Sequence, residues 1–172
     1  MSRISIATNK DIAILEALIN SAYRGEASKK GWTTEADILS GEIRTDAGDI
    51  TRQMNKPGAC FLKCNDDEGV IQGTVYLEKN NNRLYLGMLS VSPTRQAHGI
   101  GKELLHAAEQ HAKKSGCEVI YMTVISVREE LIAWYSRQGY LDSGKRIPFN
   151  GEARFGKPKI PLEFLVLEKK IK

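Results

Sequence analysis

The sequence predicts one α+β domain in which helices pack on a largely antiparallel sheet. Strand-like runs follow one another through the middle of the chain, amphipathic helical segments flank them on both sides, and the last third alternates between strand and helix. The resulting order, β-α-α-β-β-β-α-β-α-β-β, is typical of a mixed sheet with helices against its faces. The chain has 172 residues, enough for one substantial core, so we expect a single domain over residues 1–172.

The N-terminal part begins with a short strand and a helix. Residues 4–7 favour the strand, and Asn9 or Asp11 is suited to cap the helix. The apolar residues of this helix recur at helical spacing: Ile12, Ile14, Leu15, Leu18 and Ile19.

The segments that follow alternate between loop and helix. Residues 24–31 have the composition of a loop. We expect helical structure over residues 33–39 and again over residues 45–54, where Pro57 and Gly58 end it.

Three strands are expected in the middle of the chain. Residues 60–64 and 70–78 flank residues 65–69, which have the composition of a hairpin turn. Residues 79–82 make the next turn, and residues 83–91 form the third strand.

The last part of the chain alternates between helix and strand. A helix after Gly99 carries an apolar face made of Leu104, Leu105, Ala108 and Ala112. Residues 119–124 are typical of a central strand beside a crossover helix, and residues 129–138 form another helix. Two strands end the chain: one begins at Tyr140, and the other spans residues 160–167.

Composition and charge exclude several classes of protein. The net charge of +4 is spread along the chain, so we expect no nucleic-acid partner. There is no apolar leader at the N-terminus and no apolar run of ~18 residues, which favours a cytoplasmic protein without a membrane partner. Three cysteines do not suggest a disulfide framework. Cys60 and Cys64 share one strand face without a second Cys/His pair nearby, so we expect core residues and no metal site.

A glycine-containing loop between a strand and a helix is the most informative segment. The strand-like run of residues 84–91 ends before Pro93, and the following helix begins at two closely spaced glycines, Gly99 and Gly101. Backbone N–H groups at a helix start have no helical partner and lie at the positive end of the helix dipole. The segment therefore favours binding of a phosphorylated small molecule.

Two familiar phosphate loops do not fit this segment. A Walker A loop would need glycine at Gln96 and serine or threonine at Glu103, so the hydroxyl that holds magnesium is missing. A dinucleotide fingerprint would need a third glycine at Leu104.

Residues 96–101, Gln-Ala-His-Gly-Ile-Gly, complete the pattern Gln/Arg-x-x-Gly-x-Gly/Ala. This is the pyrophosphate-binding pattern of the GNAT superfamily of acyl-CoA-dependent acetyltransferases, which the chain resembles. A second match lies at residues 131–140, where Tyr135 is followed after three residues by Gly139 and Tyr140. The resemblance implies a central, mostly antiparallel sheet of six to seven strands flanked by about four helices. It covers the chain from Ile4 to Leu167.

The resemblance implies transfer of an acetyl group from acetyl-CoA, without a metal, to a primary amine of a small molecule or peptide. The implied cofactor-binding residues lie in the loop and in the strand before it, and comprise Leu89, Ser90, Val91, Gln96, Ala97, His98, Gly99, Ile100, Gly101 and Lys102. Tyr135 is the implied general acid that protonates the leaving thiolate. The family commonly has Asn where this chain has Arg128, and Arg128 could contact a phosphate instead.

The acceptor amine stays unidentified at this level. Acidic residues of the N-terminal segment, including Glu26 and Glu35, suit a cationic amine. Glu26, Glu35 and Glu78 are also candidates for the general base that takes a proton from the amine. Trp32 and the loop over residues 154–158 could line the acceptor pocket, but the loop is basic and favours an acidic substrate instead.

Two alternatives remain open. The chain could be a non-catalytic acyl-CoA-binding sensor or scaffold, which the same phosphate loop would serve. It could also be a monomer or a homodimer, since no feature of the sequence specifies an interface.

Overall fold

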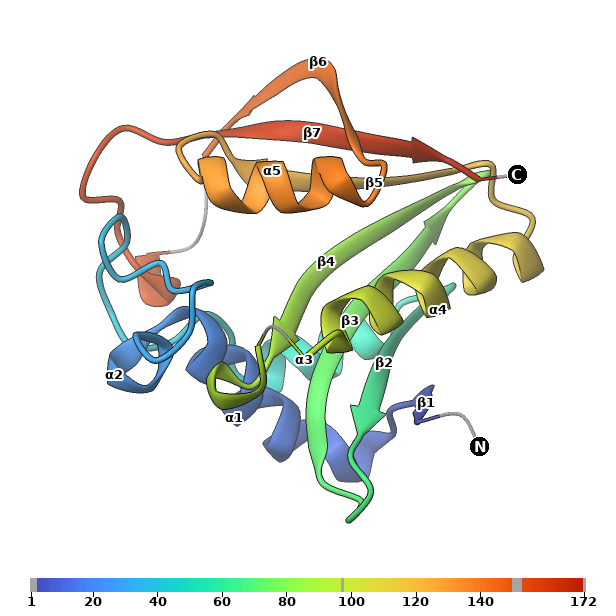
Figure 1. Cartoon of the computed structure of the whole chain (residues 1–172), viewed down its shortest axis with the longest axis horizontal. Helices are drawn as coiled ribbons and strands as arrows, with labels where there is room; N and C mark the ends of the chain where they lie inside the picture. The colour runs from blue at the N-terminus through green and yellow to red at the C-terminus, as the bar shows by residue number, and fades with distance from the viewer. Residues whose placement is uncertain (1–2, 97, 150–152, 172) are drawn as a thin grey trace.

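The computed structural model describes residues 3–96, 98–149 and 153–171 (Figure 1). Within these ranges seven strands form one sheet in the order β1-β2-β3-β4-β5-β7-β6. Neighbouring strands are antiparallel except for β4 and β5, which are parallel. The strands are β1 (Ile4–Ile6), β2 (Ala59–Asn65), β3 (Ile71–Asn80), β4 (Arg83–Val91), β5 (Val119–Ile125), β6 (Leu141–Pro148) and β7 (Glu163–Lys170).

Five α-helices accompany the sheet in the described part of the chain. They are α1 (Ile12–Tyr23), α2 (Gly25–Ser28), α3 (Ala47–Met54), α4 (Ile100–Lys114) and α5 (Glu129–Arg137). Short 3-10 helices occur at Asn9–Asp11, Pro93–Arg95 and Ala153–Phe155. The expected α+β class, with a mostly antiparallel sheet, is confirmed.

Each face of the sheet buries its own hydrophobic cluster. On one face the apolar stripe of α4, which includes Leu104 and Leu105, packs with Tyr135 of α5 against strand residues such as Leu77. On the other face α1 and α3 cover Phe61 and Tyr76. Figure 1 shows α4 and α1 on opposite sides of the strands. Because both faces are covered, the central strands are apolar along nearly their whole length.

The sheet opens between its two parallel strands. Only three residues of β4, Arg83 to Tyr85, pair with β5, where they face Val119 to Tyr121. From Leu86 onward β4 has no pairing with β5, and Figure 1 shows the two strands diverging from their shared end. The sequence does not reveal this divergence, because both segments have the composition of ordinary buried strands.

A bulge lies in the unpaired part of β4. A shift in the β3–β4 register places Met88 and Leu89 together opposite Val75. Met88 has a φ of 49°, in the left-handed region that non-glycine residues rarely adopt. The extra residue changes the alternation of side chains, so that Leu86 and Leu89 both pack in the α4 cluster while Met88 packs in the α1 cluster.

The structure corrects two expected elements of the N-terminal segment. Residues 33–39 contain a turn over residues 36–38 and an isolated bridge at Leu39 instead of a helix, and α2 falls inside the segment 24–31 that we expected to be a loop. The hydroxyl of Thr33 donates to the Ala22 carbonyl, and the hydroxyl of Thr34 accepts from the Ala36 N–H. Such side-chain hydrogen bonds compete with helical backbone bonds, which explains the turn.

Two further observations concern the last strand and the character of the helices. The last strand begins at Glu163, three residues later than expected. Among the described residues, no helix combines the length and the apolar character that crossing a membrane would need.

Gly73 sets how closely α4 can approach the sheet. A Cβ at this position would lie 2.7 Å from Cγ2 of Ile100 and 3.0 Å from Cδ1 of Leu104. We expect Gly73→Ala to lower the free energy of unfolding by about 1–3 kcal/mol, because one added carbon overpacks this contact. Urea unfolding followed by circular dichroism measures the change.

Gly48 provides the matched control for that substitution. It lies in the first turn of α3, where a Cβ would have no heavy atom closer than 3.5 Å. Gly48→Ala should leave stability unchanged or raise it by about 0.5–1 kcal/mol, because glycine is a poor helix former. Equal effects of the two substitutions would contradict the assigned packing of α4.

Candidate active site

The open edge of β4 presents backbone groups that no neighbouring strand satisfies. The Ser92 N–H donates to the Gln72 carbonyl of the β3 side at 2.9 Å. Because backbone groups alternate along the strand beyond the bulge, the N–H and carbonyl groups of Val91 point away from β3, into the gap beside β5. The Leu89 carbonyl accepts the hydroxyl hydrogen bond of Tyr23, and the Val91 carbonyl accepts from Gln96 Nε2 at 3.1 Å. The Val91 N–H remains directed at the gap.

The glycine loop leads into the first turn of α4 beside this edge. Gly99 caps the helix with a φ of 84°, a conformation that favours glycine. The Gly99 carbonyl accepts the first helical hydrogen bond, from the Glu103 N–H at 3.0 Å. The N–H groups of Ile100, Gly101 and Lys102 come before that bond and therefore have no helical partner. This geometry suits an anionic phosphate.

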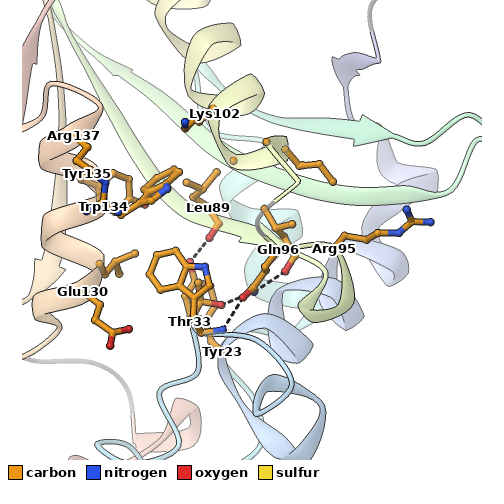
Figure 2. A pocket seen from close by; sticks show the side chains of 16 residues that line it. Tyr23, Thr33, Leu89, Arg95, Gln96, Lys102, Glu130, Trp134, Tyr135 and Arg137 are labelled. Carbon is orange, nitrogen blue, oxygen red and sulfur yellow. Dashed lines mark hydrogen bonds between the residues drawn. The ribbon is translucent and has the colours of Figure 1, made fainter.

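The Gln96 side chain joins three segments by hydrogen bonds. Its Oε1 accepts from the Trp32 N–H at 2.8 Å, and its Nε2 donates to Thr33 Oγ1 at 2.8 Å as well as to the Val91 carbonyl. The side chain thus connects the turn after α2 to the end of β4. Figure 2 shows these hydrogen bonds beneath the loop.

A cavity of about 440 Å³ lies between the glycine loop, the end of β4 and α5. Figure 2 shows Tyr135 and Trp134 of α5 on one side, with Leu89 in the centre and Lys102 above. The predicted site residues that line this cavity are Trp32, Leu89, Val91, Gln96, Gly99, Ile100, Gly101, Lys102 and Tyr135. Arg95, Lys102 and Arg137 contribute positive charge, which suits a phosphorylated ligand.

A second cavity, of about 330 Å³, lies on the other side of the same opening. Its lining comes from the bulged part of β4, from β5, from the N-terminal turns and from the loop that contains Phe155 and Gly156. Part of the C-terminal loop that we expected at the acceptor pocket therefore does lie at a cavity. The charged residues of the lining are Arg24, Arg44 and Glu35.

Four residues line both cavities: Tyr23, Leu89, Leu131 and Tyr135. A molecule in one cavity can therefore meet a molecule in the other at these side chains. Among the described residues, none forms a hydrogen bond with the Tyr135 hydroxyl, although Tyr135 is only 5% exposed. Its ring packs against Trp134 and Tyr140, with centroids at 5.1 and 6.1 Å.

Burial controls the protonation of both tyrosines at the junction. Burial, with a further contribution from Tyr23, raises the pKa of Tyr135 well above its ordinary value of 10.0. Burial and then the charge of Glu35 raise the pKa of Tyr23 to about 12. Both hydroxyls are therefore protonated at neutral pH, and only that of Tyr135 is free to donate to a ligand.

Glu35 is the acidic residue of the N-terminal segment that reaches a cavity, but it is already paired. Its Oε1 lies 3.0 Å from Nε of Arg24, and its Oε2 lies 3.8 Å from NH1 of Arg128. Arg128 also donates to the Thr33 carbonyl at 3.1 Å. The predicted contact of Arg128 with a phosphate finds no support here, because Arg128 lines neither cavity.

Other predicted site residues lie elsewhere. Glu26 is exposed and pairs with Lys29 at 2.8 Å, whereas Glu78 accepts from the Tyr76 hydroxyl away from both cavities. The Ser90 side chain is buried and donates to the Met88 carbonyl at 2.9 Å. His98 lies at a separate small hollow with Arg3 and Arg95, and Ala97 lies outside the described residues.

Sequence reasoning missed several cavity residues that a helical wheel could have indicated. Glu130, Trp134 and Arg137 lie at positions i, i+4 and i+7 of α5 and together face the first cavity. Tyr23 continues the apolar stripe of α1 and therefore gave the signal of a core residue. Among the described residues, no group of three or more His, Cys, Asp or Glu side chains could hold a metal ion.

Two cavities meet at the opening of a mixed sheet, beside a glycine loop at a helix start, which is the arrangement of a fold that binds a phosphorylated ligand. The family model described as the acetyltransferase (GNAT) family matches residues 13–140, and the chain belongs to this family. The crystal structure of the ribosomal-protein-S18-alanine N-acetyltransferase from Escherichia coli superposes with a TM-score of 0.74 at 13% identity, over 100% of this chain and 95% of that one. At this identity the likeness establishes the fold alone.

Curated relatives match part of the chain. N-acetyltransferase 8B from Homo sapiens is 29% identical over 125 residues, which cover 69% of this chain and 53% of that protein. The spermine/spermidine N(1)-acetyltransferase of Bacillus subtilis (strain 168) is 32% identical over 76 residues, which cover 44% of this chain and 49% of that protein. The matches thus span about half the length of these relatives.

The pairing of Glu35 yields a stability prediction. We expect Glu35→Ala to lower the free energy of unfolding by about 3–5 kcal/mol, because Arg24 would keep a buried charge without its partner. The backbone hydrogen bond from Glu35 to the Tyr23 carbonyl survives this change. Urea unfolding measures the loss, and Glu26→Ala is the control because that carboxylate is exposed. A similar midpoint of urea unfolding for both variants would show that Glu35 does not form the ion pair with Arg24 in solution.

Proposed function

We propose that the chain is an acetyl-CoA-dependent N-acetyltransferase that transfers the acetyl group directly to a primary amine. The observation that carries the proposal is the meeting of two cavities at Leu89 and Tyr135, beside an unpaired strand edge. The reaction needs one site for a thioester donor, a second for an amine and a contact between them. The family generally uses acetyl-CoA, which supports that choice of donor.

The first cavity fits the donor. The unpartnered N–H groups at the start of α4, together with Lys102, would hold the pyrophosphate, and the left-handed Gly99 leaves the approach open. The extended arm of the donor would lie along the open edge of β4, where the Val91 N–H group can donate. A backbone N–H at the thioester carbonyl stabilises the oxyanion that develops there.

Tyr135 is the residue that we assign to protonate the leaving group. The amine nitrogen forms a bond to the acetyl carbon and loses a proton, the carbon–sulfur bond breaks, and the sulfur leaves as a thiolate that takes the Tyr135 proton. The proton lost by the amine restores the Tyr135 hydroxyl, so that an amide and a thiol are the products. The Tyr135 hydroxyl is protonated, has no partner among the described residues and lies at the junction of the cavities. Tyr23 lies nearby, but its proton is held by the Leu89 carbonyl.

The proposal is tested by following thiol release from acetyl-CoA with a panel of amines, including amino acids, polyamines, aminoglycosides and peptides. We expect Tyr135→Phe to keep the fold and the affinity for acetyl-CoA but to lower turnover at least about tenfold, since general acid catalysis contributes roughly 10²–10⁴-fold. Calorimetry with acetyl-CoA and circular dichroism check binding and fold. Unchanged turnover in this variant would remove Tyr135 from the mechanism.

The raised pKa of Tyr135 also predicts a pH profile. A general acid must be protonated, and burial keeps this hydroxyl protonated above its ordinary value of 10.0. We therefore expect no alkaline decline in turnover that depends on Tyr135 below that pH, measured by comparing the wild type with Tyr135→Phe. A Tyr135-dependent decline near pH 8 would contradict the assignment. Binding of acetyl-CoA without turnover on any amine would instead favour a sensor or scaffold.

A further inference from the structure

The second cavity combines charged, polar and apolar groups in its lining, with polar and apolar atoms in similar shares. Among the described residues of the lining, the charged ones are two arginines and one glutamate. Burial lowers the pKa of Arg24, the charge and hydrogen bond of Glu35 oppose this, and the charge of Arg44 adds to the lowering. The described charged residues thus leave one positive charge in excess on the side where the acceptor would bind.

Arg24 and Glu35 have their partners within the protein. Nε of Arg24 binds Glu35, and its NH1 donates to the Ile43 carbonyl at 2.9 Å and also to the Phe155 carbonyl. Glu35 in addition faces Arg128. A ligand ammonium would have to compete with two arginines for this carboxylate, so Glu35 is a poor site for a cationic acceptor.

Arg44 differs from these residues because its charge is uncompensated. Among the described residues, none forms an ion pair or a side-chain hydrogen bond with the Arg44 guanidinium. Its backbone is fixed by Asn20 of α1, whose Oδ1 accepts from the Arg44 and Thr45 N–H groups at 2.5 and 3.0 Å. Asn20 Nδ2 donates in turn to the Thr45 carbonyl at 3.1 Å. The half-buried arginine is thus held at the cavity.

The position of Arg44 relative to the junction follows from Tyr23. The guanidinium carbon lies 6.0 Å from the centroid of the Tyr23 ring. The hydroxyl of the same ring donates to the Leu89 carbonyl at the junction of the cavities. One tyrosine side chain therefore separates the arginine from the place where the amine would react, a span suited to a small bifunctional molecule.

The uncharged side chains that line the second cavity are largely apolar. Phe149 and Phe164 lie there with ring centroids 5.3 Å apart, and Met88, Met122 and Leu39 contribute further apolar surface. The Tyr85 side chain lies over Gly87 in the β4 part of the lining, where a Cβ would be 2.9 Å from the Tyr85 hydroxyl. Such a surface suits an aromatic or long aliphatic group and disfavours a second ammonium.

We propose that the acceptor is an α-amino acid or close analogue with an apolar side chain, whose carboxylate is bound by Arg44. This inference rests on the proposed acetyl transfer and names its substrate class. The amine would lie at Leu89 and Tyr135, the carboxylate at Arg44, and the side chain against Phe149 and Phe164. A polyamine does not fit, because the cavity would bring its second cation to an unpaired arginine.

The test uses three acceptors that share a phenyl group: L-phenylalanine, L-phenylalaninamide and 2-phenylethylamine. For each we compare kcat/KM of the wild type with that of Arg44→Gln by thiol release, so that the intrinsic reactivity of each amine cancels. Arg44→Gln should lower kcat/KM at least about tenfold for phenylalanine, because a charge-assisted pair with the carboxylate is lost. The two compounds without a carboxylate should change by less than about twofold.

Arg52 provides the matched control. It is an exposed arginine of α3 that pairs with Asp49 at 3.3 Å and lines neither cavity. Arg52→Gln should leave all three values unchanged, whereas Arg44→Lys should keep part of the preference for phenylalanine. Because Asn20 binds the backbone of residue 44, the Arg44 variants should fold, and circular dichroism checks this.

The outcomes separate this inference from the proposed function. Equal losses for all three acceptors in Arg44→Gln, or wild-type preference for 2-phenylethylamine or spermidine, would overturn the substrate class while acetyl transfer stands. If no amine releases thiol, calorimetry of the CoA-loaded protein with the same compounds tests whether Arg44 binds a carboxylate. Phenylalanine binding that Arg44→Gln abolishes would then support the carboxylate site without catalysis, and absence of such binding would overturn it.

Discussion

The separation of β4 from β5 is the constraint on which the rest of the structure depends. A strand that loses its neighbour within a sheet exposes backbone groups that must find other partners. Here the Leu89 carbonyl receives the Tyr23 hydroxyl, and the Val91 carbonyl receives the Gln96 amide. These two bonds attach α1 and the glycine loop to the strand edge. The opening is therefore a fixed feature of the fold, with the Val91 N–H still available.

Electrostatics then distinguishes the two cavities that share this opening. The first has cations at the start of a helix and suits a polyanionic donor. In the second, Glu35 forms ion pairs with Arg24 and Arg128, so its negative charge is compensated within the protein and does not attract a ligand. That pairing reverses the inference from the acidic N-terminal segment, since the charge left for an acceptor is that of Arg44.

Sequence reasoning succeeded where a residue's role depends on its near neighbours. The order of strands and helices followed from periodicity, and the loop around Gly99 was identified because a helix start is a local feature. The helix predicted over residues 33–39 was wrong because the hydroxyls of Thr33 and Thr34 form hydrogen bonds that sequence periodicity does not indicate. Tyr23 was missed for a related reason: it continues an apolar stripe, and only its contact with Leu89, 66 residues away, separates it from a core residue.

The sequence by itself determined the fold class and the phosphate-type loop at residues 96–101, because these rest on local backbone preferences and short spacings, and its resemblance to the GNAT superfamily made Tyr135 a candidate. The tertiary structure decided which residues meet. The divergence of β4 and β5, the bulge at Met88 and the pairing of Glu35 all depend on contacts between distant segments. Whether a charge is free or compensated is set by such contacts, so the character of the acceptor cavity could be inferred only from the folded chain.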